Sequence, residues 1–413
     1  MKMNASGARG QGGDEMRVPC RRILLVAVFG ALFLMPLASF AQEESPLVWG
    51  PNLGVIGEES VAITWNTSRE VAADLHYATA IFYDASGKWE ETLSFDAHKD
   101  VADIPLGGLL PGTTYRYQLV IYEGDAVYES GIGHFTTSSP DMRSFSFLVY
   151  GDTRTNQDRN ELVADTMGWH NPDAALVVNT GDVVESPTIG RFKSFFAAIE
   201  YLALSHPYLC VIGNHEKASA RYYKFFPLPT GGGKSNEEWW SFDYGNVHFV
   251  GIDSNSITGA NAISLMREQI EWVKEDLAKS QATFKVVFFH HPIYSSTWDG
   301  GVNVPLQQEW EQIFRDTGVD VVFNGHMHCY EHFFVNGIHY VVTGGGGAPL
   351  QDPVEKAADG TVFRRYGTLH YIRVTISGNM MQVEAIPVAS VYNDEVHLTP
   401  GETAMDSFTI SKP

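Results

Sequence analysis

The chain has 413 residues, of which 44% are apolar and 19% are charged, and its formal net charge is −21. This length allows one large domain or two ordinary ones, and the composition excludes a disordered protein. A surface this acidic repels nucleic acid and anionic lipid, so we expect no nucleic-acid duplex as a partner, and an anionic substrate would need local cations.

Residues 1–41 have the composition of an export signal. Arg17, Arg21 and Arg22 precede the apolar run ILLVAVFGALFLMPLASF, which ends in small residues. A basic head, an apolar middle and a small-residue exit are typical of a secretory signal peptide, here cleaved after Ala41; a permanent membrane anchor is the alternative. We expect an exported protein, periplasmic or secreted, with no stable membrane span after signal removal. Without its five basic and two acidic leader residues, the chain would carry a net charge of −24.

Residues 45–137 alternate short apolar strands with turns. Segments such as SVAITWNT, TTYRYQLVIYE and GIGHFTT alternate with a period of two, and no helical periodicity persists between them. This pattern predicts an antiparallel β-sandwich. A Pro-Gly turn before Tyr115 and Tyr117, with Trp65 on an early strand, makes the segment similar to a fibronectin type III domain with its tyrosine corner. We expect it to pack against the domain that follows.

After a polar linker at 138–143, buried strands alternate with helical segments. The strands are FSFLVYGD, AALVVNTGD, YLCVIGNHE, FKVVFFHHP and VDVVFNGHMH. The clearest helix is EQIEWVKEDLAKS, which has Ile270, Val273 and Leu277 on one face. Strand–helix alternation predicts an α/β domain, which we place at 144–390, followed by a C-terminal tail at 391–413.

Each of these five strands ends in polar residues that can bind a metal ion. In α/β sheets the ligand site lies outside the carboxyl ends of the strands, so these side chains should meet at one edge. Mixed oxygen and nitrogen ligands suit Zn, Mn, Fe or Co better than Ca, and without Cys clusters a structural zinc site is a poor alternative. The residues are Asp152, Asp182, Asn214-His215-Glu216, His290-His291, and His326 with His328.

The order of these motifs resembles that of a known family. The series GD, GDxxE, GNHE, VxxH and GHMHxYE is similar to the motifs of the calcineurin-like metallophosphoesterases, and most of all to the purple acid phosphatase branch. The resemblance covers essentially the whole chain after the leader. It implies a fibronectin-like sandwich, then a four-layer αββα domain with a two-metal site that hydrolyses phosphoric esters.

The resemblance also implies how the ligands divide between two divalent or trivalent ions, which would be Fe, Zn or Mn. The first site is the ligand set Asp152, Asp182 and His328. The second site is the ligand set Asp182, Asn214, His290 and His326. Asp182 would bridge the two ions, roughly 3.5–4 Å apart, and the hydroxide that they generate from water would attack the phosphorus of a small phosphorylated substrate.

Three further residues follow these ligands directly in the sequence. The resemblance assigns His215 to stabilising the phosphoryl oxygens or protonating the leaving group. Glu216 would orient His215 or would be a structural residue beside the turn. His291 has no ligand counterpart in the family, so it would contact substrate or pack in its loop.

Two residues depart from the family pattern at the first site. Purple acid phosphatases have a Tyr ligand where this chain has Glu185, and other branches have Asp-x-His where this chain has Arg154. Without that tyrosinate we expect no purple colour. Three interpretations remain open. Glu185 binds the first ion; or Arg154 and Glu185 form an ion pair beside an ion that keeps three protein ligands and water; or Arg154 occupies the first site and one ion acts alone. Arg154 could also contact two phosphoryl oxygens.

The sequence therefore predicts an exported, metal-dependent phosphomonoesterase of the acid phosphatase type. A phosphodiesterase or nucleotidase on the same site is the alternative, because the leaving-group pocket would be built by the loops 217–240 and 294–304. A non-catalytic binding protein with a degenerate first site is the rival from another class. We further expect Cys210 to be a packing residue and His332 a surface loop residue.

Overall fold

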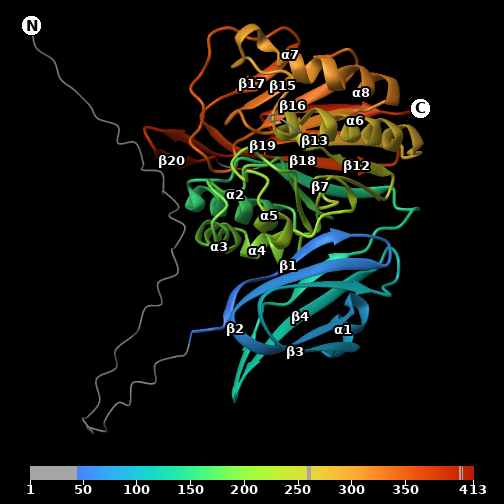
Figure 1. The fold of residues 1–413 in the computed structure, drawn as a ribbon, viewed down its shortest axis with the longest axis vertical. Helices are drawn as coiled ribbons and strands as arrows, with labels where there is room; N and C mark the ends of the chain where they lie inside the picture. Colours follow the sequence, from blue (N-terminus) through green and yellow to red (C-terminus); the bar gives the residue numbers. More distant parts are fainter. Residues whose placement is uncertain (1–43, 258–261, 400, 402) are drawn as a thin grey trace, which may run out of the picture. The chain divides into compact units, whose positions relative to one another are not determined.

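A computed structural model of the chain describes residues 44–257, 262–399, 401 and 403–413 (Figure 1). The predicted export signal at 1–41 lies outside the described residues. Ser45–Pro413 form one unit, in which a β-domain is followed by an α/β domain. Within the described residues, no helix has the length and apolar character needed to cross a membrane.

The N-terminal domain is an antiparallel β-domain organised around two long strands. Strand β2 pairs with β1, β3 and β4, and β4 also pairs with β5 and β6. Tyr115 OH accepts a hydrogen bond of 2.9 Å from the backbone N–H of Leu110, which is the contact of a tyrosine corner. The elements are β1 (Leu47–Ile56), β2 (Ser60–Thr79), α1 (Ala80–Ser86), β3 (Glu91–Gly107), β4 (Thr114–Glu123), β5 (Ala126–Glu129) and β6 (Gly133–Thr136).

The first sheet of the α/β domain, here called the β7 sheet, has the strand order β20-β19-β18-β7-β8-β9, with β21 also paired to β19. Strands β7, β8 and β9 are parallel, so their carboxyl ends lie at the same edge. The strands are β7 (Ser144–Tyr150), β8 (Val177–Asn179), β9 (Tyr208–Cys210), β18 (Thr368–Ser377), β19 (Met380–Tyr392), β20 (Glu395–Leu398) and β21 (Asp406–Ser411).

The second sheet, here called the β13 sheet, has the order β10-β11-β12-β13-β14-β16-β15-β17. Its central strands β12, β13, β14 and β16 are parallel. The strands are β10 (Gly231–Gly232), β11 (Trp239–Tyr244), β12 (Val247–Gly251), β13 (Phe284–Phe289), β14 (Val321–Asn324), β15 (Tyr330–Val335), β16 (Ile338–Thr343) and β17 (Thr361–Arg365). All five strands predicted to carry polar ends are present, divided between the two sheets.

Helices cover the outer faces of both sheets, which confirms the predicted four-layer αββα class (Figure 1). On α6, Val273 and Leu277 are fully buried against the β13 sheet, as the apolar periodicity predicts. The helices are α2 (Gln157–His170), α3 (Ile189–Ala198), α4 (Glu200–Ala203) and α5 (Ala220–Phe225) beside the β7 sheet, and α6 (Ala262–Lys279), α7 (Val304–Leu306) and α8 (Gln312–Thr317) beside the β13 sheet.

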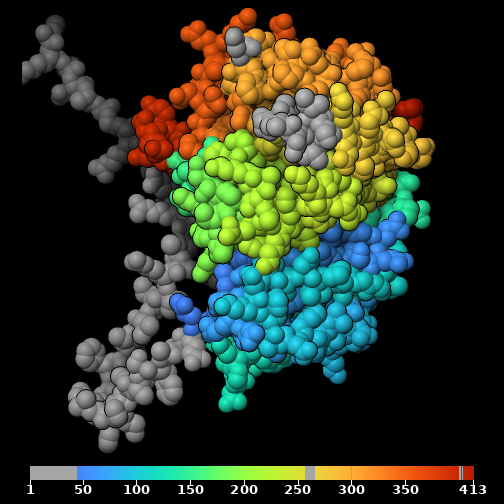
Figure 2. All heavy atoms as spheres, viewed as in Figure 1, coloured from blue at the N-terminus to red at the C-terminus, as the bar shows by residue number. Residues whose placement is uncertain are grey.

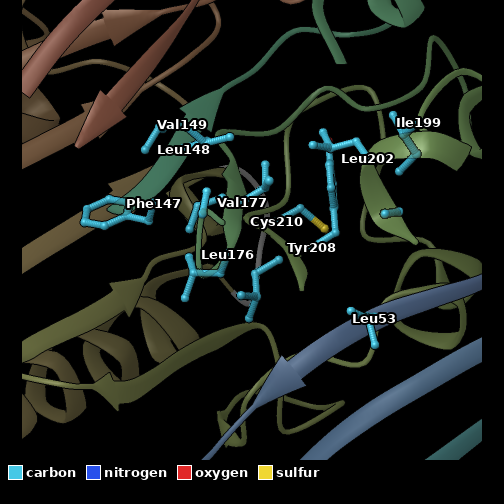
Figure 3. Packing of buried hydrophobic residues seen from close by; sticks show 14 of the residues in the cluster. Leu53, Phe147, Leu148, Val149, Leu176, Val177, Ile199, Leu202, Tyr208 and Cys210 are labelled. Carbon is cyan, nitrogen blue, oxygen red and sulfur yellow. The ribbon is translucent and has the colours of Figure 1, made fainter. Parts of the chain in front are cut away.

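The two sheets face each other across an aromatic core. Phe249, Phe288 and Phe323 stack on successive strands, with ring centroids 6.1 and 5.5 Å apart, and Phe147 of the opposite sheet meets Phe249 edge-on at 5.0 Å. Figure 3 shows the other face of the β7 sheet, where side chains of β8 and β9 lie near Leu202 of α4. Cys210 is fully buried there, which confirms that it is a packing residue.

The atoms of the N-terminal domain lie directly against those of the α/β domain (Figure 2), and aromatic and backbone contacts join the two. Trp49 on β1 stacks on Phe196 of α3 with ring centroids 4.1 Å apart. Tyr117 OH donates a 2.8 Å hydrogen bond to the Leu204 carbonyl. Because α3 follows the GDxxE loop, these contacts help to hold the segment that carries two predicted site residues.

Strand pairing continues past residue 390, into the segment predicted to be a tail. Asp406 at the start of β21 accepts hydrogen bonds from Tyr330 OH at 2.7 Å and from His332 Nδ1 at 2.8 Å, so β21 joins the two sheets. His332 is 1% exposed and its ring stacks on Phe408. The prediction of a surface loop at His332 is therefore wrong: this His lies on β15, and its polar atoms are satisfied inside the fold.

His248 makes stability depend on pH. Its ring on β12 contacts Asp243 Oδ1 at 2.7 Å and Asp276 Oδ2 at 2.9 Å. Burial lowers the pKa of His248, but the hydrogen bonds to both carboxylates outweigh it and raise the pKa to about 9. Because this exceeds the unfolded value of about 6.5, the stabilisation is complete below pH ~6.5 and is lost as pH rises through ~9.

We therefore expect His248→Asn to lower the free energy of unfolding by roughly 1–3 kcal/mol at pH 6 and by much less at pH 10. Urea unfolding at the two pH values measures the difference. His397→Asn, at an exposed position on β20, is the control and should show no such dependence. An equal loss at both pH values for His248→Asn would contradict the assignment.

Candidate metal centre

The predicted site residues meet at one edge of the α/β domain, although they come from two sheets. Asp152, Asp182 and Asn214 follow the parallel strands β7, β8 and β9 of one sheet. His290 and His326 follow the parallel strands β13 and β14 of the other. The carboxyl ends of both parallel sets thus face the same space, so two half-sites combine into one.

Close packing of the strand-end loops requires their glycines. A Cβ added at Gly213 would overlap Asp182 Oδ1, and one at Gly325 would lie 2.6 Å from Asp152 Oδ2. The residues that follow a glycine in three of these loops adopt left-handed backbone, with φ of 57° at Asp152, 57° at Asp182 and 69° at His326. Such strain in non-glycine residues persists where the surrounding structure enforces it, commonly at functional sites.

Backbone amides of neighbouring loops hold the two buried aspartates. The N–H of His326 donates to Asp152 Oδ2 at 2.9 Å, and the N–H of His215 donates to Asp182 Oδ1 at 3.0 Å. Burial raises the pKa of Asp182, but the adjacent His290 and the His215 amide outweigh it and hold the pKa well below its usual range. Both carboxylates are therefore fixed in position before any ion binds.

Glu216 holds the surrounding loops together and does not orient His215. Its fully buried carboxylate accepts hydrogen bonds from the backbone N–H groups of Asp182 at 3.1 Å, Val184 at 3.1 Å and Gly213 at 2.7 Å. His215 is oriented instead by the Glu185 carbonyl, which accepts from His215 Nδ1 at 2.8 Å. Of the two roles left open for Glu216, these bonds fit the structural one, because Glu216 turns inward, beneath the loops. Burial and the nearby Asp182 raise the pKa of Glu216 to about 7.

Hydrogen bonds fix the protonation of two site histidines. His290 Nδ1 donates to the Thr180 carbonyl at 3.0 Å, and His328 Nδ1 donates to the Pro349 carbonyl at 2.6 Å. A carbonyl only accepts, so Nδ1 carries a proton in both rings and Nε2 is the nitrogen left to bind a metal ion, as in metal-binding histidines. The buried His206 is a contrast, because both its ring nitrogens contact carbonyl oxygens.

The four second-site donors lie as close together as ligands of one metal ion. His290 Nε2 is 3.1 Å from Asn214 Oδ1, 3.2 Å from His326 Nδ1 and 3.4 Å from Asp182 Oδ1. Tetrahedral ligands about 2.0–2.1 Å from zinc are about 3.3 Å from each other, so the set fits an ion. Burial lowers the pKa of His290, but Asp182 raises it to about 9, whereas burial and His290 lower the pKa of His326 to about 4.

The first site has fewer donor atoms close together than the second site has. Asp152 Oδ1 lies 3.4 Å from His328 Nε2, and within the described residues no hydrogen bond reaches this buried oxygen. A buried carboxylate oxygen without a donor calls for a cation nearby. Glu185, however, is turned toward Arg154, whose Nη1 lies 2.5 Å from Glu185 Oε2. Burial raises the pKa of Glu185, but hydrogen bonds from Thr155 and Arg154 hold it below its usual value.

The sequence left the role of His291 open between substrate contact and loop packing, and it placed Trp298 only in the loop 294–304. The His291 ring lies 4.5 Å from that of His326 and 5.0 Å from that of His290, and its Nδ1 contacts Ser254 Oγ at 2.8 Å. Burial and the two neighbouring histidines lower the pKa of His291 to about 2. The Trp298 ring stacks on His326 at 5.9 Å. The His-His pair was the one available signal; the position of Trp298 depends on loop geometry.

Comparisons with known proteins agree with this geometry. Residues 145–330 match the family model of the calcineurin-like phosphoesterases. Purple acid phosphatase 15 of Arabidopsis thaliana is 28% identical over 306 residues, covering 62% of this chain and 55% of that protein. The chain thus spans about half the length of that relative.

Solved structures share the fold at low identity. A purple acid phosphatase from yellow lupin seeds, PPD1, superposes with a TM-score of 0.70 at 17% identity, covering 87% of this chain and 74% of that one. The structure of PhoD gives a TM-score of 0.68 at 13% identity, covering 89% and 90%. Residues 145–330 thus match the calcineurin-like phosphoesterases, and the solved structures share the fold. Proteins similar in sequence include purple acid phosphatases, as the order of the motifs predicts.

Glu216→Gln tests the role of Glu216 beneath the loops. The Gln amide would turn an N–H₂ group toward backbone donors, so at least one of the three hydrogen bonds is lost. We expect the free energy of unfolding to fall by about 1–3 kcal/mol, measured by urea denaturation. Glu161→Gln, at an exposed position on α2, is the matched control. Unchanged stability of Glu216→Gln would show that the loops do not depend on this carboxylate.

Proposed function

We propose that this protein hydrolyses phosphoric esters, preferring small phosphomonoesters, with the help of bound divalent or trivalent metal ions. The observation that carries the proposal is the convergence of four donors on one point, beside an oxygen of Asp152 that accepts no hydrogen bond within the described residues. The four donors belong to Asp182, Asn214, His290 and His326. Fe, Zn and Mn suit this mixed set of oxygen and nitrogen donors.

The chain's own residues hold and orient the reacting groups. Bound ions would supply Lewis-acid stabilisation of the phosphoryl oxygens and activation of water. Asp182 presents one oxygen to each side of the centre, with Oδ1 near His290 and Oδ2 near Arg154. Arg154 is 16% exposed at its side chain, so it reaches both the interior carboxylate and the surface from which a phosphate arrives. In a protein of net charge −21, this local cation favours an anionic substrate.

His215 is the proposed proton donor to the leaving group. Its Nδ1 donates to the Glu185 carbonyl, so Nε2 is the ring atom available to give a proton to the leaving oxygen. The Nε2 atom lies 3.8 Å from Asp182 Oδ2, which places it beside the same centre. The side chain is 24% exposed, so it is accessible to a bound ester.

A hollow beside the centre offers room for the leaving group. It has a volume of about 400 Å³ and is lined by Ser296, Trp298, Gly300, Gly301, Lys356, Ala357, Ala358 and Asp359. Trp298 is held in place because its Nε1 donates to the Pro292 carbonyl at 3.2 Å, and its ring also stacks on His326. We propose that esters with a planar leaving group stack against this ring. The same hollow would suit the alternative activities, a nucleotidase or a phosphodiesterase.

Export is part of the proposal. It is supported by the basic, apolar and small-residue composition of residues 1–41 and by the acidic composition of the remaining chain.

Substitution of second-site ligands tests the activity. We expect Asn214→Ala and His290→Ala to lower kcat/KM for an aryl phosphate monoester at least 100-fold, because each removes a ligand from the ion. Glu185→Ala should cost far less, since Glu185 pairs with Arg154. Metal removal by a chelator should abolish hydrolysis, and added Zn, Mn or Fe should restore it. The exposed variants Asn379→Ala and His397→Ala are controls.

A metal-replete protein that hydrolyses neither mono- nor diesters would overturn the proposal and favour a non-catalytic binding protein. Equal losses for Glu185→Ala and Asn214→Ala, with a lower metal content in Glu185→Ala, would show that Glu185 is a ligand.

Trp298→Leu tests the leaving-group hollow. We expect KM for an aryl phosphate to rise about five- to tenfold, as the loss of about 1 kcal/mol of ring stacking predicts, with little change for glycerol phosphate. Trp169→Leu, at an exposed position on α2, is the control. A similar rise in KM for both substrates would place the leaving group elsewhere.

A further inference from the structure

The guanidinium of Arg154 stands where the first site would have its fourth ligand. Arg154 Nε lies 3.3 Å from Asp182 Oδ2, and Nη1 lies 2.5 Å from Glu185 Oε2. One side chain thus contacts both carboxylates at the positions that would complete the first site. Thr155 Oγ1 donates to the same Glu185 oxygen at 2.5 Å, which fixes that carboxylate in the pair.

The two oxygens of Asp182 have different partners. Oδ1 lies 3.4 Å from His290 Nε2 and accepts from the His215 amide, so it belongs to the second site. Oδ2 faces Arg154. A carboxylate that bridges two ions shares its negative charge between them. Here the charge on Oδ2 is already balanced by a permanent cation, because a guanidinium does not lose its proton in proteins.

The remaining first-site donors are too few to hold an ion firmly in spite of its repulsion by the Arg154 guanidinium. Asp152 Oδ1 and His328 Nε2 are available, 3.4 Å apart, but Glu185 is held by hydrogen bonds from two side chains. An ion placed beside Asp182 Oδ2 would also meet the positive charge of Arg154 in a site where both carboxylates are at most 1% exposed and little screened by solvent. The second site has four donors and no such neighbour among them.

We propose that Arg154 takes the place of one of the two metal ions, so that the chain holds a single tightly bound ion, at the second site. The first position binds its ion at least 100-fold more weakly. The guanidinium then supplies the positive charge on the Asp152–His328 side, and its planar donors suit phosphoryl oxygens. This inference rests on the proposed function for the identity of the ligands, but its test counts ions and does not require activity.

The test is the number of ions that the full chain retains. Protein loaded with excess Mn²⁺ and then desalted is analysed for metal per chain by mass spectrometry, and for spin coupling by electron paramagnetic resonance. We expect one ion per chain in the wild type, with the spectrum of an isolated Mn²⁺. Two ions of similar affinity, or a coupled pair, would overturn this inference alone. No retained ion would overturn both this inference and the proposed function.

Two variants separate the charge of Arg154 from its lack of ligand atoms. Arg154→His removes the cation and adds a nitrogen ligand, so we expect two ions per chain and a coupled spectrum. Arg154→Met removes only the cation, so the weaker ion should bind at least tenfold more tightly than in the wild type. Arg116→Met breaks an exposed ion pair with Asp84 in the N-terminal domain and should leave the count at one.

An ion count of one in Arg154→His, with the fold intact by circular dichroism, would contradict the role given to Arg154. If either variant fails to fold, the number of ions per wild-type chain and the spectrum of its bound Mn²⁺ still test the inference.

Discussion

The centre depends on buried carboxylates that accept hydrogen bonds from the backbone of neighbouring loops. Asp152 accepts from the amide of His326, Asp182 from that of His215 and Glu216 from that of Asp182, and each of these amides lies in a loop that follows a different strand from its acceptor. A buried charge is costly unless it is paired or hydrogen-bonded, so these loops satisfy the carboxylates only when all the strands are in place. The same bonds fix the oxygen that each Asp turns toward a ligand, which gives the site its geometry without an ion.

The sequence allowed the fold class, the strand ends and the ligand-bearing motifs to be predicted, because buried strands and terminal polar residues leave a strong pattern. The apolar runs alone did not indicate which strand belongs to which sheet, since they look alike in either, and the two-sheet αββα arrangement followed from the resemblance to a family. The sequence left two roles open for Glu216 and could not choose between them, because it does not show that this carboxylate points away from its neighbour His215 in space. His332 looked like a loop residue because its partner, Asp406, lies 74 positions away.

Arg154 and Glu185 both depart from the family motifs in this chain, and the two departures are in contact with each other. Either residue alone would leave a charge beside Asp182 without its partner, whereas the pair is close to neutral and joined by a short ion contact. The rest of the centre in this chain matches the family motifs, and added side chains at Gly213 and Gly325 would overlap its carboxylates. The two departures in this chain lie at the rim, where Arg154 and Glu185 are both partly exposed.

The pairing of β7 has a consequence for the order in which the molecule is assembled. This strand carries Asp152 at its end, and its antiparallel neighbour is β18, with Val149 opposite Ile372. More than 200 residues separate the two positions along the chain, and closing so long a loop slows folding. The centre can therefore take its shape only after nearly the whole domain has been synthesised. Only the folded domain brings the ligand side chains close enough together to bind one ion, whereas in a nascent fragment these side chains lie apart.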